Sequence, residues 1–349
     1  MTGEDACLSQ RATFYKVFPA PKSLTRTAGL WQKPSVLAFF LHSFGPFVFR
    51  IGDVGPRWYG LSYVASALVA YWLYRRLAVR GYTDVGPEKV ADFITWTGLF
   101  GVLLGGRIGW IIFYGMKEPH ENPWWMFEVW KGGMSAHGGI LGLVLVTYAL
   151  SRRWKVSWTS IGDTLCVVAT AGLFLVRCAN FINGELIGKP ATVAWAVQFP
   201  RELLDMPVGR DEIAPKVMDA LGRSATDIVE TIPRDAETNL VLREFLTPRH
   251  PSQLYEALLE GALMFAVLWF MRTRCRVPRG VLTGSFFILY ATARIIGEMF
   301  REPDPAWAVG SFSAGQFLSL FMYGIGAAFI VWGLKTRHYE KANAERSAQ

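Results

Sequence analysis

The sequence predicts an all-α integral membrane protein with about seven transmembrane helices and a small outward-facing head domain. Of its 349 residues, 52% are hydrophobic and only 18% are charged. Soluble proteins usually carry charge on about a quarter of their residues. Several apolar runs also approach the roughly 20 residues that a helix needs to cross the hydrocarbon of a bilayer. This composition therefore indicates a membrane protein rather than a soluble one.

Seven apolar segments are the candidate spans. They are Trp58–Val79, Phe93–Tyr114, Ser135–Leu150, Trp158–Arg177, Tyr255–Met271, Val281–Phe300 and Ala314–Leu334. The third and fifth are short, so their ends must reach into the membrane interface. The spans divide the chain into a polar basic tail (1–35), an interfacial segment (36–56), four spans (57–182), a head domain (183–254), three spans (255–334) and a C-terminal tail (335–349).

Basic residues gather in the loops on one side of these spans. The clusters are Arg75, Arg76, Arg80 and Lys89; Arg152, Arg153 and Lys155; Arg272, Arg274, Arg276 and Arg279; and Lys335, Arg337 and Lys341. Because short cytoplasmic loops are enriched in lysine and arginine, this side is predicted to face the cytoplasm. The net charge of +8 therefore reflects membrane topology and argues against a nucleic-acid partner.

The segment Val36–Ile51 fits this topology poorly. The tail before it is basic and would prefer the cytoplasm, whereas the first span is predicted to start on the outer side. The segment contains His42, Pro46 and Arg50 and is short for a span. An interfacial helix or a re-entrant piece is preferred, and an eighth span stays open. In the head domain, the charge-mixed stretch Arg201–Glu244 is expected to be a partly mobile insertion.

Ionisable side chains in the spans mark candidate functional positions, because a charge in hydrocarbon is energetically expensive. Arg107, Asp163 and Arg177 lie within spans or at their ends. In "YATARIIGEMFREPD", four polar side chains share one helical face near the outward end of the sixth span. They are Tyr290, Arg294, Glu298 and Arg301.

Arg294 and Glu298 admit two interpretations. They form either an internal ion pair that holds helices together or part of an anion site, in which arginine grips phosphate through a fork of donors. Arg177 favours the second, because it lies at the same outward boundary. The phosphate of a phospholipid is the anion available at that depth.

Other polar residues near this boundary have weaker signals. In "GGMSAHGGILG", glycines allow a helix or a lipid to approach the backbone closely. For His137 in this motif, a packing role and a general-base role stay equally open. Tyr59 at the start of the first span is by default an aromatic-belt residue. His250, Gln253 and Tyr255 are expected to be structural.

Several other functional classes lack their motifs. The sequence contains no H-E-x-x-H, no G-x-x-x-x-G-K-[ST] and no G-x-S-x-G, and its four cysteines have no metal-ligand spacing. A phospholipid transporter or flippase stays as the alternative to an enzyme, although the mirrored halves of many transporters are not visible. The intramembrane charges gather mostly at one face, which favours an enzyme.

The motifs "GGRIGWIIFY", "GGMSAHGGILG", "RCANFINGELIGKP", "RHPSQLYEALLEG" and "ARIIGEMFREPD" occur in this order. Together they resemble the prolipoprotein diacylglyceryl transferase family of the bacterial inner membrane, from about Ile51 to Gly333. The resemblance implies a seven-span fold with an outward head domain and a cytoplasmic C-terminus, as the loop charges also indicate.

The resemblance also implies a reaction. The diacylglyceryl group of phosphatidylglycerol moves to the thiol of the lipobox cysteine in a preprolipoprotein, a thioether forms, and glycerol 1-phosphate leaves. The implied partners are phosphatidylglycerol, the preprolipoprotein and membrane lipids. No metal or soluble cofactor is implied.

The resemblance assigns roles to three groups of residues. It implies that Arg177, Arg294 and His137 are catalytic, that Tyr59, Asn180, Gly188 and Tyr290 bind substrate, and that Asp163, Glu185, Glu298 and Arg301 support them. The arginines suit a departing phosphate, and Asp163 and Glu298 are expected to hold cationic groups in place. The thiol must become a thiolate to attack carbon. His137 is the candidate base, and an arginine-activated or lipid-assisted route stays open.

This chain departs from the family pattern at Val176 and Ala179, which replace two glycines. Those glycines are expected to allow close approach of lipid or helix. The stretch before "RHP" is longer than usual for the family, and the basic N-terminal tail is extra. Arg177 and Asn180 are retained, so an active enzyme is expected.

Overall fold

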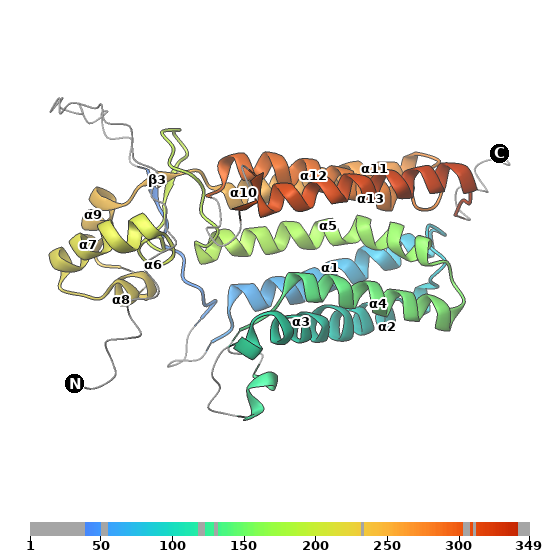
Figure 1. Ribbon diagram of the computed structural model, residues 1–349, viewed down its shortest axis with the longest axis horizontal. Helices are drawn as coiled ribbons and strands as arrows, with labels where there is room; N and C mark the ends of the chain where they lie inside the picture. The colour runs from blue at the N-terminus through green and yellow to red at the C-terminus, as the bar shows by residue number, and fades with distance from the viewer. Residues whose placement is uncertain are drawn as a thin grey trace, which may run out of the picture. The chain divides into compact units, whose positions relative to one another are not determined.

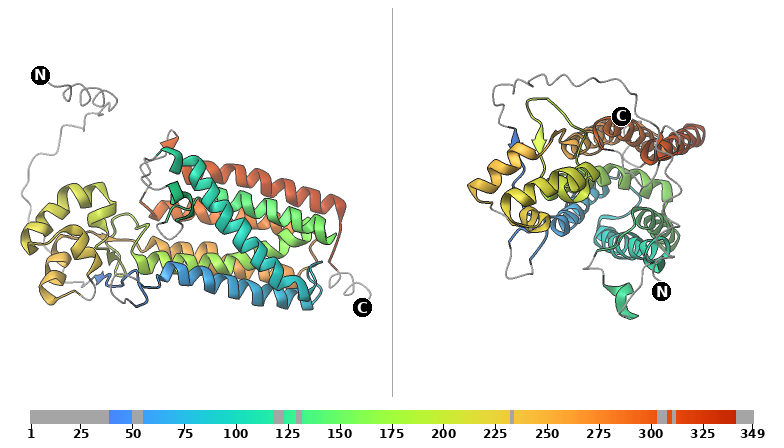
Figure 2. Two further views of the ribbon diagram at one scale, coloured as in Figure 1. Left: turned by 90° about the horizontal axis from the view of Figure 1, so that it is seen from below. Right: turned by 60° about the vertical axis from the view of Figure 1, so that its left-hand side comes forward.

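The computed structural model describes residues 39–49, 55–117, 123–128, 132–231, 234–302, 308–309 and 312–340. The described residues from Phe39 onward form one compact unit. Within it, long helices run side by side, and the short helices of the head lie beyond one end of them (Figures 1 and 2). The N-terminal tail 1–35 with Cys7, and the last residues 341–349, lie outside the described part of the chain.

The long helical segments overlap the predicted spans. They are α1 (Trp58–Val79); α2 (Val90–Trp96), which continues through the π-helical stretch Thr97–Leu104 into α3 (Gly105–Phe113); α4 (Ala136–Trp154); α5 (Trp158–Asn183); α10 (Ser252–Glu256), which continues through the π-helical stretch Ala257–Leu263 into α11 (Met264–Arg274); α12 (Val281–Phe300); and α13 (Ala314–Thr336). Helices α4 and α5 and the α10–α11 segment extend beyond the predicted bounds. Short 3₁₀ turns lie at Pro87–Lys89, Gly115–Lys117 and Pro123–Phe127.

Among the described residues, five segments are long and apolar enough to cross a membrane. They are Pro87–Phe113, Trp158–Asn183, Ser252–Arg274, Val281–Phe300 and Ser319–Thr336. The prediction of an all-α membrane protein is thereby confirmed. Helices α1 and α4 are 22 and 19 residues long and pack against α5 and the α2–α3 segment, and their assignment as spans stays a prediction.

Large apolar side chains are exposed on the surface of the bundle. Leu68 on α1, Leu145 on α4 and Phe321 on α13 are 64%, 60% and 58% exposed. Apolar side chains that would promote association in water can instead contact lipid tails in a bilayer. The main buried core gathers around α1, α5, α11 and α12. It includes Tyr74, Phe93, Ile161, Val167, Leu268 and Leu282.

Glycines bring α4 into close contact with the α2–α3 segment. A Cβ atom added at Gly105 would lie 2.7 Å from the carbonyl oxygen of Gly138, and one at Gly109 would lie 2.6 Å from its Cα. Side chains at these positions would push the helices apart, so close approach requires glycine. The expectation drawn from "GGMSAHGGILG" is therefore confirmed for helix packing.

The head is a small unit of short helices and three two-residue strands, with its own core. Strand β2 (Val197–Gln198) pairs in parallel with β1 (Phe40–Leu41) and antiparallel with β3 (Pro248–Arg249). The helices beside it are α6 (Glu202–Asp205), α7 (Ala214–Leu221), α8 (Ala225–Glu230) and α9 (Ala236–Phe245), with a π-helical turn at Gly209–Ile213. Their shared buried side chains are Leu41, Leu203, Ala214, Val217, Ile228, Leu242 and Leu246.

Two expectations from the sequence concern residues of this head. The described part of the charge-mixed stretch Arg201–Glu244 is folded into helices α6–α9 around a common core. Of the segment Val36–Ile51, the structure describes residues 39–49, which contain β1 and no helix. Within these residues, the preferred interfacial helix is therefore replaced by a strand of the head sheet. A further strand pair, β4 (Ala308–Val309) and β5 (Phe312–Ser313), precedes α13.

Candidate functional site

An ionic network joins three helical segments where α5 and α12 end and α10 begins. Arg177 of α5 donates from Nε and Nη2 to Oε2 of Glu260, at 3.0 and 2.8 Å. Its Nη1 lies 2.8 Å from Oε2 of Glu256. Arg294 of α12 lies with Nη1 3.2 Å from Glu256 Oε1 and 3.5 Å from Glu260 Oε1. The same two carboxylates therefore hold an arginine from each of two helices.

Two further side chains of α12 complete this arginine–glutamate network. Arg294 donates from Nη2 to Oε1 of Glu298 at 2.7 Å, and Arg301 Nη1 lies 3.4 Å from Glu256 Oε1. The network as defined here comprises Arg177, Arg294, Arg301, Glu256, Glu260 and Glu298. The predicted stripe on the sixth span is thereby confirmed for its three charged members.

The positions of Glu256 and Glu260 depend on the local backbone. They flank the start of the π-helical stretch Ala257–Leu263, and π-turns often occur at functional sites. At Gly261, an added Cβ would lie 2.6 Å from Cβ of Phe174 on α5. Glycine therefore lets α5 lie against this stretch. Since Arg177 follows Phe174 by one turn, the close approach brings its guanidinium to Glu260.

Charge balance explains how so many ions are buried together. The network contains three guanidinium groups and three carboxylates, so their charges cancel. Glu256 and Glu260 have side chains with 0% exposure, whereas Arg177 and Arg294 retain 13% and 17%. Buried charges need partners of opposite sign, and the glutamates supply them. The partly exposed arginines can still offer N–H donors to an incoming anion.

Asn180, in the last turn of α5, and Glu185, in the loop after α5, follow Arg177 in the chain. Asn180 Nδ2 donates to Glu185 Oε1 at 2.7 Å, and Gln253 Nε2 donates to the backbone oxygen of Glu185 at 2.6 Å. The turn needs left-handed backbone at Gly184 and at Leu186, with φ of +68° and +57°. Such a conformation is strained for leucine and is typical of functional sites.

His42 of the head braces the end of α5. Its Nε2 lies 2.7 Å from the carbonyl oxygen of Phe181, and its ring packs against Phe44, Phe181 and Phe199. Burial lowers the pKa of His42 from 6.5 to about 4, because a charged imidazole would lose its hydration. The sequence offered no signal for this role, since the contact joins residues 139 positions apart.

Gly188 is enclosed by backbone. An added Cβ would lie 2.2 Å from the oxygen of His250 and 2.8 Å from that of Phe300, so the close packing here requires glycine. Its own oxygen accepts a hydrogen bond from Arg249, a buried residue that pairs with Glu202 and Glu302. These contacts explain Gly188 by packing, and a substrate contact there stays a prediction.

Asp163 lies at the opposite end of α5 from Arg177. Its carboxylate accepts hydrogen bonds from the backbone N–H groups of Gly280 and Thr283, both at 2.8 Å, and from the Thr283 hydroxyl at 2.7 Å. It thus caps the start of α12 from a neighbouring helix. Fourteen helical residues correspond to about 21 Å, so Asp163 does not contact Arg177, and its supporting role in the site stays a prediction.

Three predicted site residues do not belong to the network. Tyr290 lies one turn before Arg294 and stacks on Phe286, with 5.8 Å between ring centroids. Tyr59, at the start of α1, contacts the ring of Tyr63 at 5.2 Å. The side chain of His137 is exposed in the first turn of α4, and the described contacts do not join it to the network.

Arg107 has a different role from the network arginines. It is buried and donates to the backbone oxygens of Trp125, Met126, Gly132 and Gly133 at 2.6 to 3.1 Å. The side chain thereby fixes the chain just before α4.

The departures Val176 and Ala179 do not interrupt α5. Ala179 is buried, where it supplies packing.

Sequence reasoning missed Glu256 and Glu260. Both lie in the quoted motif "RHPSQLYEALLEG", four residues apart in an otherwise apolar segment. An ionisable residue in a span is a functional candidate, so their spacing was an available signal. Their partners were not, because Arg177 and Arg294 come from other helices.

Comparisons with known proteins identify the family of this chain. The family model described as prolipoprotein diacylglyceryl transferase matches residues 46–332. Proteins named phosphatidylglycerol–prolipoprotein diacylglyceryl transferase are similar to this chain over most of its length. The one from Bdellovibrio bacteriovorus is 36% identical over 84% of this chain and 94% of its own length. Those from Nitratidesulfovibrio vulgaris and Erwinia tasmaniensis are 37% and 36% identical, covering 80% and 85% of this chain and 91% and 95% of themselves. These matches give no support to a transporter.

Proposed function

Since the chain belongs to the prolipoprotein diacylglyceryl transferase family, we propose that it transfers the diacylglyceryl group of phosphatidylglycerol to the lipobox cysteine of a preprolipoprotein. The cysteine thiolate attacks the glycerol carbon that carries the phosphate ester. A carbon–sulfur bond forms, the carbon–oxygen bond breaks, and its electron pair leaves with glycerol 1-phosphate. The thiol proton is lost before or during the attack.

The observation that carries the proposal is the pair Arg177 and Arg294, held together by buried glutamates. A phosphate that leaves with an additional negative charge is stabilised by donors already in place. Arg177 and Arg294 would grip the phosphate of the lipid from two sides. Glu256, Glu260 and Glu298 keep these guanidinium groups in position, so little reorganisation is needed when the substrate arrives.

Residues beside the network would orient the lipid and the peptide. Asn180, Tyr290 and Tyr59 offer hydrogen-bond donors for headgroup or phosphate oxygens, and Arg301 adds positive charge. His137 is the candidate base because imidazole accepts protons near neutral pH and its side chain is exposed. Thiolate formation assisted by an arginine or by the lipid is the competing route for the same proton.

The location follows from the charges at the two ends of the bundle. The arginine clusters in and just after the last turns of α1, α4 and α11 lie at the end opposite to the network. By the positive-inside rule they mark the cytoplasm. The network would then face the outer side of a bacterial inner membrane, where phosphatidylglycerol and the exported preprolipoprotein can meet.

The test uses purified protein in detergent with phosphatidylglycerol and a lipobox peptide. Release of glycerol phosphate and the mass of the peptide are followed for the wild type, for Arg294→Ala and for Arg201→Ala. Arg201 is the matched control, because it pairs only with Asp205 on the head surface among its described ion pairs. We expect product from the wild type and from Arg201→Ala, and none from Arg294→Ala.

Two results would overturn the proposal or part of it. A folded wild-type protein that forms no product beside an active positive control would contradict the transferase activity. Full activity of Arg294→Ala would leave the activity in place and remove the phosphate role of that arginine.

A further inference from the structure

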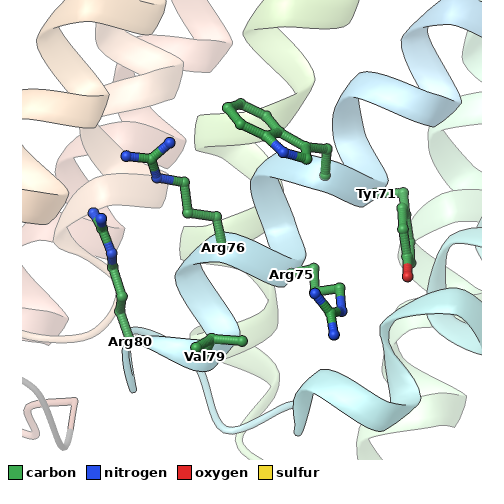
Figure 3. Close-up of a pocket in the computed structure, with 6 residues that line it drawn as sticks. Tyr71, Arg75, Arg76, Val79 and Arg80 are labelled. Carbon is green, nitrogen blue, oxygen red and sulfur yellow. The ribbon is translucent and has the colours of Figure 1, made fainter.

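A groove of about 370 Å³ lies on the last turns of α1, at the opposite end of the bundle from the arginine–glutamate network (Figure 3). Its walls are Tyr71, Trp72, Arg75, Arg76, Val79 and Arg80. All six side chains are exposed. In Figure 3, Arg76 and Arg80 extend to one side of α1 and Arg75 to another. A ligand bound along this part of α1 would have cations on two sides.

The three arginines of the groove lack acidic partners among the described residues. At the same end of the bundle, Arg279 lies 2.6 Å from Asp84 and 2.8 Å from Glu340, so carboxylates do compensate arginines nearby. The Arg76 guanidinium instead lies over the ring of Trp72, with 5.4 Å to its centroid. This contact orients the guanidinium and leaves its charge uncompensated.

An apolar strip leads away from the cations along α1. Leu61, Val64, Leu68 and Trp72 recur at helical spacing and are 46%, 57%, 64% and 58% exposed. From Arg76 to Leu68 the helix rises about 12 Å, and to Val64 about 18 Å. A leaflet of hydrocarbon is about 15 Å thick. The strip therefore has the length of one set of acyl chains.

We propose that this groove binds an anionic glycerophospholipid. Its phosphate contacts Arg76 and Arg80, Arg75 adds positive charge from another side of α1, and its acyl chains lie on the apolar strip. Guanidinium groups bind phosphate oxygens through charge-assisted hydrogen bonds, and anionic lipids concentrate cations at the membrane surface. The occupant is a lipid rather than free phosphate, because Arg76 and Arg80 continue the helical face of the apolar strip, and only a phosphate joined to acyl chains contacts both.

The bound lipid is distinct from the substrate of the proposed reaction. Helix α1 has 22 residues, which corresponds to about 33 Å. A phosphate at Arg76 therefore lies far from Tyr59 at the other end of α1 and belongs to the opposite leaflet. The inference does not depend on the proposed transferase activity.

The test compares two double variants by native mass spectrometry in detergent. Arg76→Gln with Arg80→Gln removes two groove cations. Arg152→Gln with Arg153→Gln removes the same charge from exposed positions at the same end of the bundle, on α4. Phosphatidylserine is the probe and phosphatidylcholine is the zwitterionic reference. We expect phosphatidylserine retention to fall about tenfold in the groove variant and less than twofold in the control.

Three outcomes would overturn the proposal. Equal losses in both double variants would indicate general attraction to positive charge, and unchanged retention in the groove variant would exclude the site. Displacement of the lipid by millimolar inorganic phosphate would identify a phosphate site without a lipid requirement. If the groove variant fails to fold, Arg76→Lys with Arg80→Lys keeps the charge and removes the forks. It should still lose retention against Arg152→Lys with Arg153→Lys.

Discussion

Each end of the helical bundle contains arginines paired with carboxylates, but the two sets differ in access. In the network, Arg177 and Arg294 keep 13% and 17% of their side chains exposed. At the opposite end, Arg272 is 0% exposed and donates to the Thr164 hydroxyl at 2.9 Å. Its carboxylate partner, Glu340, is 1% exposed. The same residue types therefore form an accessible site at one end and a fully buried structural ion pair, called the brace below, at the other.

The segment after α13 covers the paired arginines at the end of the bundle opposite to the network. Arg279 receives its acidic partners from two distant segments, Asp84 and Glu340. The N–H group of Arg279 donates to the oxygen of His338 at 2.7 Å, which holds the segment before Glu340 in place. Burial raises the pKa of Glu340, because the carboxylate has lost its water. An arginine at a bundle end is thus a binding candidate only when its guanidinium remains reachable.

The largest effect should come from the same substitution at the two ends. Arg177→Lys keeps the charge but removes the fork that fits a phosphate, so kcat/KM in the peptide assay should fall about 100-fold or more. Arg272→Lys should leave kcat/KM within about threefold and lower the free energy of unfolding by about 1 to 2 kcal/mol. Equal effects of both variants on activity would break the distinction between site and brace.

A second prediction concerns Glu260, which we treat as a positioning residue. Glu260→Gln leaves Arg177 without its two-donor partner in a buried position, which should lower the free energy of unfolding by about 3 kcal/mol. Activity should fall mainly through kcat, because the guanidinium groups lose their alignment. Glu298→Gln is the control. Its 9% exposure lets water replace the carboxylate, and its stability loss should be smaller.

A stability difference that is equal for Glu260→Gln and Glu298→Gln would contradict the ranking of these carboxylates by burial. The measurement is denaturant or thermal unfolding in one detergent, with activity measured on the same preparations. Glu260→Asp offers a second comparison, because it keeps the charge and shortens the reach.

The smallest effect should appear in the pH dependence of stability. The pKa of His42 is about 4 in the folded protein and 6.5 as the reference value. A lowered folded pKa means that the unfolded chain binds the proton more tightly, so stability is complete above pH 6.5 and is lost as pH falls towards 4. Between pH 7.5 and pH 5 the loss should be about 2 kcal/mol.

The check is to follow unfolding of the wild type and of His42→Gln across this pH range. The wild type should lose stability on acidification, and the variant should lose about 2 kcal/mol less. Equal pH dependence of the two proteins would place the titrating group elsewhere. His250→Gln is the control, since His250 interacts with the Tyr255 hydroxyl at 3.2 Å in a different turn.

The part of the site that lies on one helix was predictable. Arg294, Glu298 and Arg301 share a helical face, and helical periodicity alone places them together. Glu256 and Glu260 were recognisable in principle by the same spacing. Their pairing with Arg177 was not, because it depends on how closely Gly261 lets two helices approach. His42 was read as part of a membrane-associated segment, and its contact with Phe181 joins distant parts of the chain.

By itself, the sequence determined the membrane class, the long helices and the charged residues at their ends, because composition and local periodicity are properties of each segment. It also carried the family motifs. Tertiary structure alone decided which carboxylate faces which arginine, that Asp163 caps α12 and that Phe40–Leu41 joins the head sheet. These are contacts between segments distant in the chain, and packing between helices sets them.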